Sequence, residues 1–139
     1  MFPIIVLMLA VIAACGQRSE TVRIDNVVVG EMPPAQQVAV GYLSLHNSGD
    51  ESWILNGIYC DCAESVEVHR TLYSSGVMSM REVRHLTIDP HTRVNFEPRG
   101  MHLMFFGVNE RFVAGQMLRL RFEFNDRQPI EVEAEVKRL

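Results

Sequence analysis

Hydrophobic and polar residues alternate with a period of two through most of the chain after residue 20, and helical periodicity is almost absent. The clearest case is the segment 117–124, where Leu118, Leu120, Phe122 and Phe124 share one face and charged residues occupy the other. The alternation resumes over residues 130–137 after a turn-forming stretch. These two segments therefore predict an antiparallel hairpin with rows of Arg and Glu facing solvent.

The same alternation predicts further short strands, separated by turn residues such as those of Asn47–Asp50. The predicted strands cover residues 22–29, 38–46, 53–59, 65–71, 77–81, 84–88, 92–96 and 102–106. In the strand 65–71, Val66 and Val68 should point inward and Glu67 and His69 the other way. Short strands at this spacing predict an all-β sandwich or barrel, formed as a single domain by residues 21–139.

The first residues of the chain predict a targeting signal. Phe2 to Ala14 is an almost uninterrupted apolar run of thirteen residues, too short for a bilayer core that needs about 20 in a helix. A signal peptide over residues 1–14 fits better. Ile12–Cys15 resembles a bacterial lipobox, which predicts a lipid anchor on Cys15 and a short tether over residues 15–20. We therefore expect an extracytoplasmic or periplasmic, membrane-anchored protein, with Gly16 favouring the outer membrane.

The length and the net charge of the chain exclude some classes of function. A chain of 139 residues supports one domain of ordinary size and leaves no room for a second catalytic domain. Lys and Arg number 13 against 17 Asp and Glu, giving a net charge of -4, and the longest basic run is Lys137–Arg138. Because nucleic-acid binding needs a basic surface, we expect no nucleic-acid partner.

The chain contains eight Met and five His, a high content of thioether and imidazole side chains for its length. His102 and Met104 are two residues apart on one predicted strand, so they share a face, and Met78 and Met80 form a second such pair. His69 ends the strand just before that second pair. If neighbouring strands bring these segments together, two imidazoles and two thioethers could converge on one ion. Such a set favours Cu(I), because thioether is a soft, neutral donor that needs no deprotonation.

The spacing of these residues resembles the H-x10-M-x21-H-x-M signature of the periplasmic copper chaperone family PCu(A)C, with His69, Met80, His102 and Met104 at its four positions. Residues 41–50, 66–69, 76–81 and 100–104 extend the resemblance, which covers about residues 21–137. It implies a cupredoxin-like antiparallel β-barrel and a surface Cu(I) site made by those four side chains. It also implies a chaperone rather than an enzyme, which delivers copper to a respiratory oxidase subunit of the CuA type or to its assembly factor.

Several residues depart from the pattern typical of that family. Met78 and Met101 lie beside predicted ligands and are additional candidates, as are Cys60 and Cys62, which could form a disulfide or remain two thiols near a metal. Three other functions stay open at this point. They are a thiol-disulfide reductase using Cys60 and Cys62, an electron-transfer role, and a lipid-anchored interaction domain without a metal.

Overall fold

A computed structural model describes residues 21–139, so the predicted signal peptide, Cys15 and the tether lie outside the described residues. The described chain is all-β, as predicted, and no helix within it is long and apolar enough to cross a membrane. The strands are β1 (Val22–Gly30), β2 (Ala39–Asn47), β3 (Trp53–Tyr59), β4 (Ala63–Ser74), β5 (Val77–Glu82), β6 (Leu86–Ile88), β7 (Thr92–Phe96), β8 (Met101–Val108), β9 (Met117–Phe124) and β10 (Ile130–Lys137).

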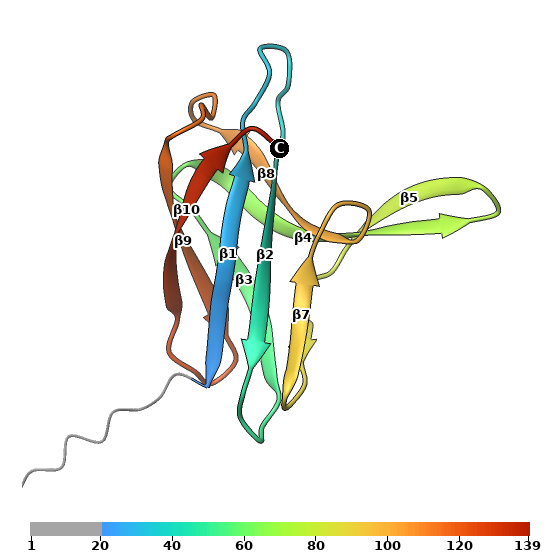
Figure 1. Cartoon of the computed structure of the whole chain (residues 1–139), viewed down its shortest axis with the longest axis vertical. Coiled ribbons are helices and arrows are strands. Elements are labelled where there is room, and N and C mark those ends of the chain that lie inside the picture. The colour runs from blue at the N-terminus through green and yellow to red at the C-terminus, as the bar shows by residue number, and fades with distance from the viewer. Residues whose placement is uncertain (1–20) are drawn as a thin grey trace, which may run out of the picture.

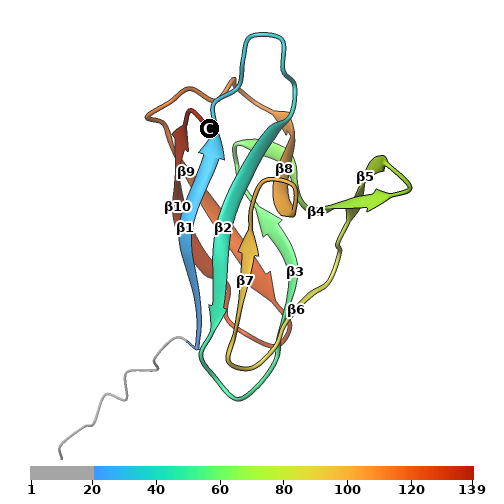
Figure 2. The same cartoon turned by 45° about the vertical axis from the view of Figure 1, so that its right-hand side comes forward.

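The strands close into a barrel. Pairing runs from β4 through β8, β2, β1, β10, β9 and β3, and the contact of Ile58 with Val66 joins β3 back to β4. Most pairs are antiparallel, as predicted, but β1–β10 and β7–β8 are parallel. Figure 1 shows β1, β2 and β10 side by side along the barrel, and Figure 2 shows β3 with the short β6 beside it.

The period-two alternation explains the core. Inward positions of β9 are buried and its outward positions are mostly exposed, and β2 shows the same alternation between buried and half-buried residues. Leu103 and Phe105 of β8 are fully buried, and the ring of Phe105 meets that of Phe112 edge-on with 5.7 Å between centroids. Val66 and Val68 face the core from β4, as predicted. Buried side chains of β4 and β8 therefore pack the core directly behind this part of the barrel wall.

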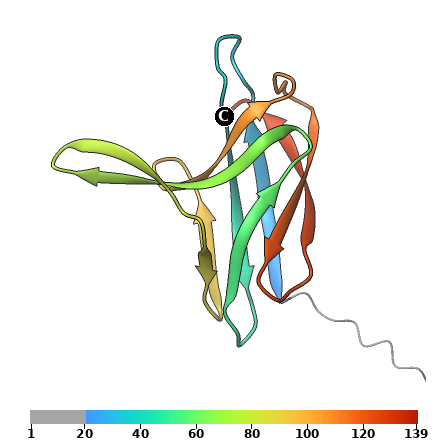
Figure 3. The ribbon, with the colours of Figure 1, turned by 180° about the vertical axis from the view of Figure 1, so that it is seen from behind.

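One hairpin leaves the barrel. The pairing of β4 with β8 ends at Arg70 and Met101, whereas β4 continues outward paired only with β5. Figures 1 and 3 show this arm, formed by residues 70–82, projecting from the side of the barrel. Its turn is the two-residue loop Ser75–Gly76, with φ of 50° and 75°. Positive φ at both positions is typical of the type I′ turn that matches the twist of a hairpin.

Candidate metal centre

The two predicted imidazole ligands are direct cross-strand neighbours. His69 on β4 lies opposite His102 on β8, and their ring centroids are 6.2 Å apart with 39° between the planes. His102 is 5% exposed, and the side chain of His69 is 15% exposed. The imidazoles therefore lie deeper than the surface position that the resemblance implies.

The two predicted thioether ligands lie on the same sheet face, on either side of the imidazoles. Met104 is two residues beyond His102 on β8 and faces Glu67 across the β4–β8 ladder. Met80 on β5 faces Thr71, which is two residues beyond His69 toward the tip of the arm. Met80 and Met104 are thus both diagonal neighbours of His69, and such neighbours are about 7–8 Å apart, which is within reach of a long side chain. Met80 is 50% exposed, so one side of the cluster is open to solvent.

The ring nitrogens are arranged in a way that fits a soft cation. Nδ1 of His102 donates to the carbonyl oxygen of Gly100 at 3.2 Å, so Nε2 of a neutral ring carries the lone pair. Nδ1 of His69 is buried and has no hydrogen-bond partner among the residues that the structure describes. Over the same residues no group of three or more His, Cys, Asp and Glu is gathered around one point. The predicted donor set of two imidazoles and two thioethers would suit Cu(I) better than harder ions.

The arm is tied to the barrel at this position. The carbonyl of Gly100, which accepts from His102, also accepts from the backbone N–H of Thr71 at 3.1 Å. His69 is next to Arg70, where the β4–β8 pairing ends, and it pairs with both His102 and Glu82. The predicted ligands therefore sit at the junction between the arm and the barrel.

The structure separates the two additional methionines. Met78 lies on the same face as Met80 but two residues farther out along the arm, opposite Tyr73, and is 57% exposed. Met101 lies opposite Arg70 on the other face, packs against the core, and its sulfur accepts from the Arg70 guanidinium at 3.5 Å. Met78 thus shares the face of the candidate site, and Met101 does not.

The question left open for Cys60 and Cys62 is answered by a disulfide between them, with Cα atoms 5.1 Å apart. The pair occupies the turn between β3 and β4. Cys62 is seven residues from His69, roughly 20 Å along an extended strand at about 3.3 Å per residue. The sulfurs of the disulfide are therefore remote from the imidazoles.

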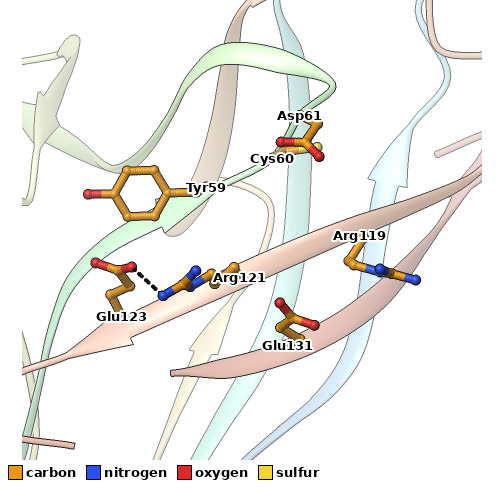
Figure 4. Close-up of a pocket in the computed structure, with 7 residues that line it drawn as sticks. All are labelled: Tyr59, Cys60, Asp61, Arg119, Arg121, Glu123 and Glu131. Carbon is orange, nitrogen blue, oxygen red and sulfur yellow. Dashed lines mark ion pairs between the residues drawn. The ribbon is translucent and has the colours of Figure 1, made fainter. Parts of the chain in front are cut away.

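An open hollow of about 490 Å³ lies beside the disulfide (Figure 4). It is lined by Tyr59, Cys60, Asp61, Arg119, Arg121, Glu123 and Glu131. Both signs of charge are present, and Arg121 is paired with Glu123 at 3.1 Å. None of the four predicted ligands lines this hollow, so it is separate from the candidate metal centre.

Glu67 is a site residue that the sequence reasoning missed. Its carboxylate Oε2 is 2.8 Å from Nε2 of His69, and the residue faces Met104 across the ladder. The alternation in β4 could have indicated this neighbour, because residues two apart on a strand share a face. It placed Glu67 beside His69, but nothing in the alternation marks a Glu as a partner of a ligand.

Comparison with known proteins shows the family and the fold of the chain. The family model described as "Putative lipoprotein LpqE-like" matches residues 22–136. The protein of Leifsonia xyli subsp. xyli (strain CTCB07) named "Putative lipoprotein Lxx21020" is 24% identical over 123 residues, covering 88% of this chain and 73% of its own length. Protein RP573 of Rickettsia prowazekii (strain Madrid E) is 29% identical over 86 residues, covering 61% of this chain and 48% of its own.

Solved structures of PCuAC domains have the same fold. The copper-bound PCuAC domain from PmoF2 superimposes with a TM-score of 0.72 at 18% identity, over 86% of this chain and 94% of that one. The Cu(I) form of DR1885 from Deinococcus radiodurans gives a TM-score of 0.71 at 25% identity, over 90% of this chain and 83% of that one. The resemblance to the PCu(A)C family and the cupredoxin-like barrel that it implies are therefore confirmed.

Proposed function

Because this chain belongs to the LpqE-like lipoprotein family, we propose that it is an extracytoplasmic copper chaperone that binds one Cu(I) ion and passes it to a partner protein. The observation that carries the proposal is the pairing of His69 with His102, flanked on one sheet face by Met104 and Met80. We assign these four side chains as the ligands. No covalent chemistry on the cargo is required, so the protein acts as a carrier and not as an enzyme.

The physical character of the ligand set supports Cu(I) as the cargo. Two neutral imidazoles and two thioethers leave the site with the single positive charge of the ion, and thioethers discriminate against Zn²⁺, Mg²⁺ and Ca²⁺. Thioethers also resist disulfide formation, which matters outside the cytoplasm, where the Cys60–Cys62 pair is oxidised. A soft and uncharged donor set therefore suits an exported copper carrier.

We further propose that the protein is lipid-anchored through Cys15, at the outer membrane where the cell has one, and gives copper to a CuA-type respiratory oxidase subunit or its assembly factor. The lipoprotein descriptions of the family and of Lxx21020 support the anchor. Anchoring raises the local concentration of the carrier at the membrane surface. The acceptor rests on the resemblance to the PCu(A)C family.

The exposed arm supports transfer to a docked partner. It carries five of the exposed large apolar side chains of the described chain, namely Leu72, Tyr73, Val77, Met78 and Met80. An apolar surface that projects from the barrel and includes a proposed ligand gives an acceptor direct access to the ion by ligand exchange. We place the docking surface there.

X-ray absorption at the copper edge of the Cu(I)-loaded full chain tests the ligand assignment. We expect one Cu(I) retained per chain after dialysis, with two nitrogen and two sulfur neighbours. A third sulfur would place Met78 in the coordination shell and revise the ligand set. A chain that retains no Cu(I) would refute the chaperone function.

A further inference from the structure

A carboxylate stands inside the proposed copper site. Glu67 shares the sheet face of His69 and lies directly opposite Met104. Its Oε2 is 2.8 Å from Nε2 of His69, and the Glu67 and His69 side chains are 33% and 15% exposed. A partly buried acidic group in contact with a ligand ring constrains that ring, because both ends of the contact are held by the same strand.

The contact dictates which ring nitrogen of His69 carries the proton. An ionised carboxylate can only accept, so Nε2 must donate its proton to Oε2. In the neutral ring the lone pair then resides on Nδ1. Nδ1 is the atom that is buried without a partner in the described part of the chain. A buried acceptor without a donor is unfavourable, and a bound cation would satisfy it.

His102 has the opposite arrangement. Its Nδ1 donates to the Gly100 carbonyl at 3.2 Å, so the lone pair of the neutral ring lies on Nε2. The two imidazoles face each other across the β4–β8 ladder with different nitrogens available. Hydrogen bonds from the far nitrogen of a ligand ring commonly fix both its tautomer and its orientation at metal sites.

We propose that Glu67 is a positioning residue for copper, which holds the proton on Nε2 of His69 so that His69 binds the ion through Nδ1 while His102 binds it through Nε2. This inference rests on the proposed copper-binding function and deepens it. Glu67 also places a negative charge next to a site whose four ligands are neutral, which offsets the charge of Cu(I). It thus acts through His69 and makes no contact with the ion.

The chain offers a matched control in Glu82. This residue also lies directly opposite His69, on β5, and on the same sheet face. Its carboxylate, however, is paired with Nε of Arg84 at 3.2 Å. Two acidic residues therefore neighbour the same imidazole, and one of them contacts it in the structure.

Long-range 1H–15N correlation spectra of the 15N-labelled full chain, recorded before and after addition of Cu(I), test the assignment because they distinguish the two nitrogens of each ring. We expect the proton of His69 on Nε2 in the metal-free protein. On loading, the signals of His69 Nδ1 and His102 Nε2 should shift. A shift of His69 Nε2 instead, with Cu(I) bound, overturns the inference and leaves the chaperone function standing. Failure to retain any Cu(I) refutes the function and the inference together.

Variants of Glu67 distinguish the effect of its hydrogen bond on the His69 tautomer from the effect of its negative charge. Glu67→Leu removes the acceptor, and we expect Cu(I) affinity to fall about 10- to 100-fold, as is usual when the partner of a ligand ring is lost. Glu67→Gln keeps an oxygen that accepts from Nε2, so coordination through Nδ1 should persist with a smaller loss. Glu82→Leu should bind Cu(I) like the wild type. The proposal is contradicted if Glu67→Leu and Glu82→Leu lose Cu(I) affinity equally, or if Glu67→Leu binds Cu(I) with wild-type affinity. If Glu67→Leu fails to fold, the spectra of the unsubstituted chain decide the proposal.

Discussion

Met80 on β5 is the direct cross-strand partner of Thr71 on β4, two residues beyond His69. This position makes Met80 a diagonal neighbour of His69 on the same sheet face, and Met80 is 50% exposed. We expect Met80→Leu to preserve the arm, because Leu has a similar volume and fits an exposed strand position. The soft donor is lost, so Cu(I) affinity should fall by more than the roughly tenfold that a lost ligand partner costs. Competition with a chromogenic Cu(I) chelator measures the change.

Met117 provides the control for this substitution. It is 54% exposed on β9, so Met117→Leu removes a thioether of similar exposure from a strand that carries none of the proposed ligands. The Met117→Leu protein should bind Cu(I) as the wild type does. If both variants retain wild-type Cu(I) affinity, Met80 is not a ligand. If both lose Cu(I) affinity equally, the loss is not specific to the position of Met80.

Removal of the disulfide should leave the copper site unchanged. Cys60 and Cys62 lie in the turn before β4, seven or more residues from His69, so Cys60→Ser combined with Cys62→Ser takes no sulfur from the proposed coordination shell. We expect the same Cu(I) stoichiometry and the same copper-edge spectrum as in the wild type. A decrease in sulfur neighbours would show instead that the cysteines reach the ion.

Tyr73 allows docking to be separated from binding. It lies on the arm opposite Met78 and is 60% exposed, but it offers copper no soft donor. We expect Tyr73→Thr to leave Cu(I) affinity unchanged and to slow copper transfer to a CuA-type acceptor domain, measured as the copper content of the separated partners over time. Tyr59, 57% exposed on β3, is the matched control, and Tyr59→Thr should transfer copper at the wild-type rate. Equal rates for all three proteins would place the docking surface elsewhere.

Glu31 makes stability depend on pH. The backbone N–H of Ala114, at 3.2 Å, and then the guanidinium of Arg138, at 3.0 Å, lower the pKa of Glu31 below its ordinary value. A lowered pKa in the folded state means that the ionised carboxylate stabilises the fold above the pKa of the unfolded chain. This stabilisation is lost as pH falls through the folded-state pKa. Glu31→Gln should therefore lower the Tm near pH 7 and have less effect near pH 3, as measured by thermal unfolding.

The exposed Glu110 serves as the reference for that experiment. Glu110→Gln should change the Tm little at either pH, because surface substitutions away from specific contacts are usually worth no more than about 0.5 kcal/mol. A Tm difference between wild type and Glu31→Gln that stays constant from pH 7 to pH 3 would contradict the assigned role of the carboxylate.

The sequence by itself determined the strands and the face that each residue takes. Period-two alternation is a local property, so it located all ten strands of the described chain to within a few residues and put Val66 and Val68 in the core with His69 on the opposite face. The spacing of His69, Met80, His102 and Met104 was also readable without a structure, because it matches a known family signature. Local patterning does not, however, say which strands become neighbours.

The tertiary structure decided the register, and the register makes the site. Sliding β4 along β8 by two residues would keep every side chain on its face but would move His69 away from His102, so only long-range pairing fixes that contact. The same register places Glu67 directly opposite Met104. Because the β4–β8 pairing ends at Arg70, Met80 lies on the projecting arm, where β5 pairs only with β4. The parallel pairing of β1 with β10 and the closure of β3 on β4 likewise depend on how the whole barrel packs its core, which no single segment of the sequence encodes.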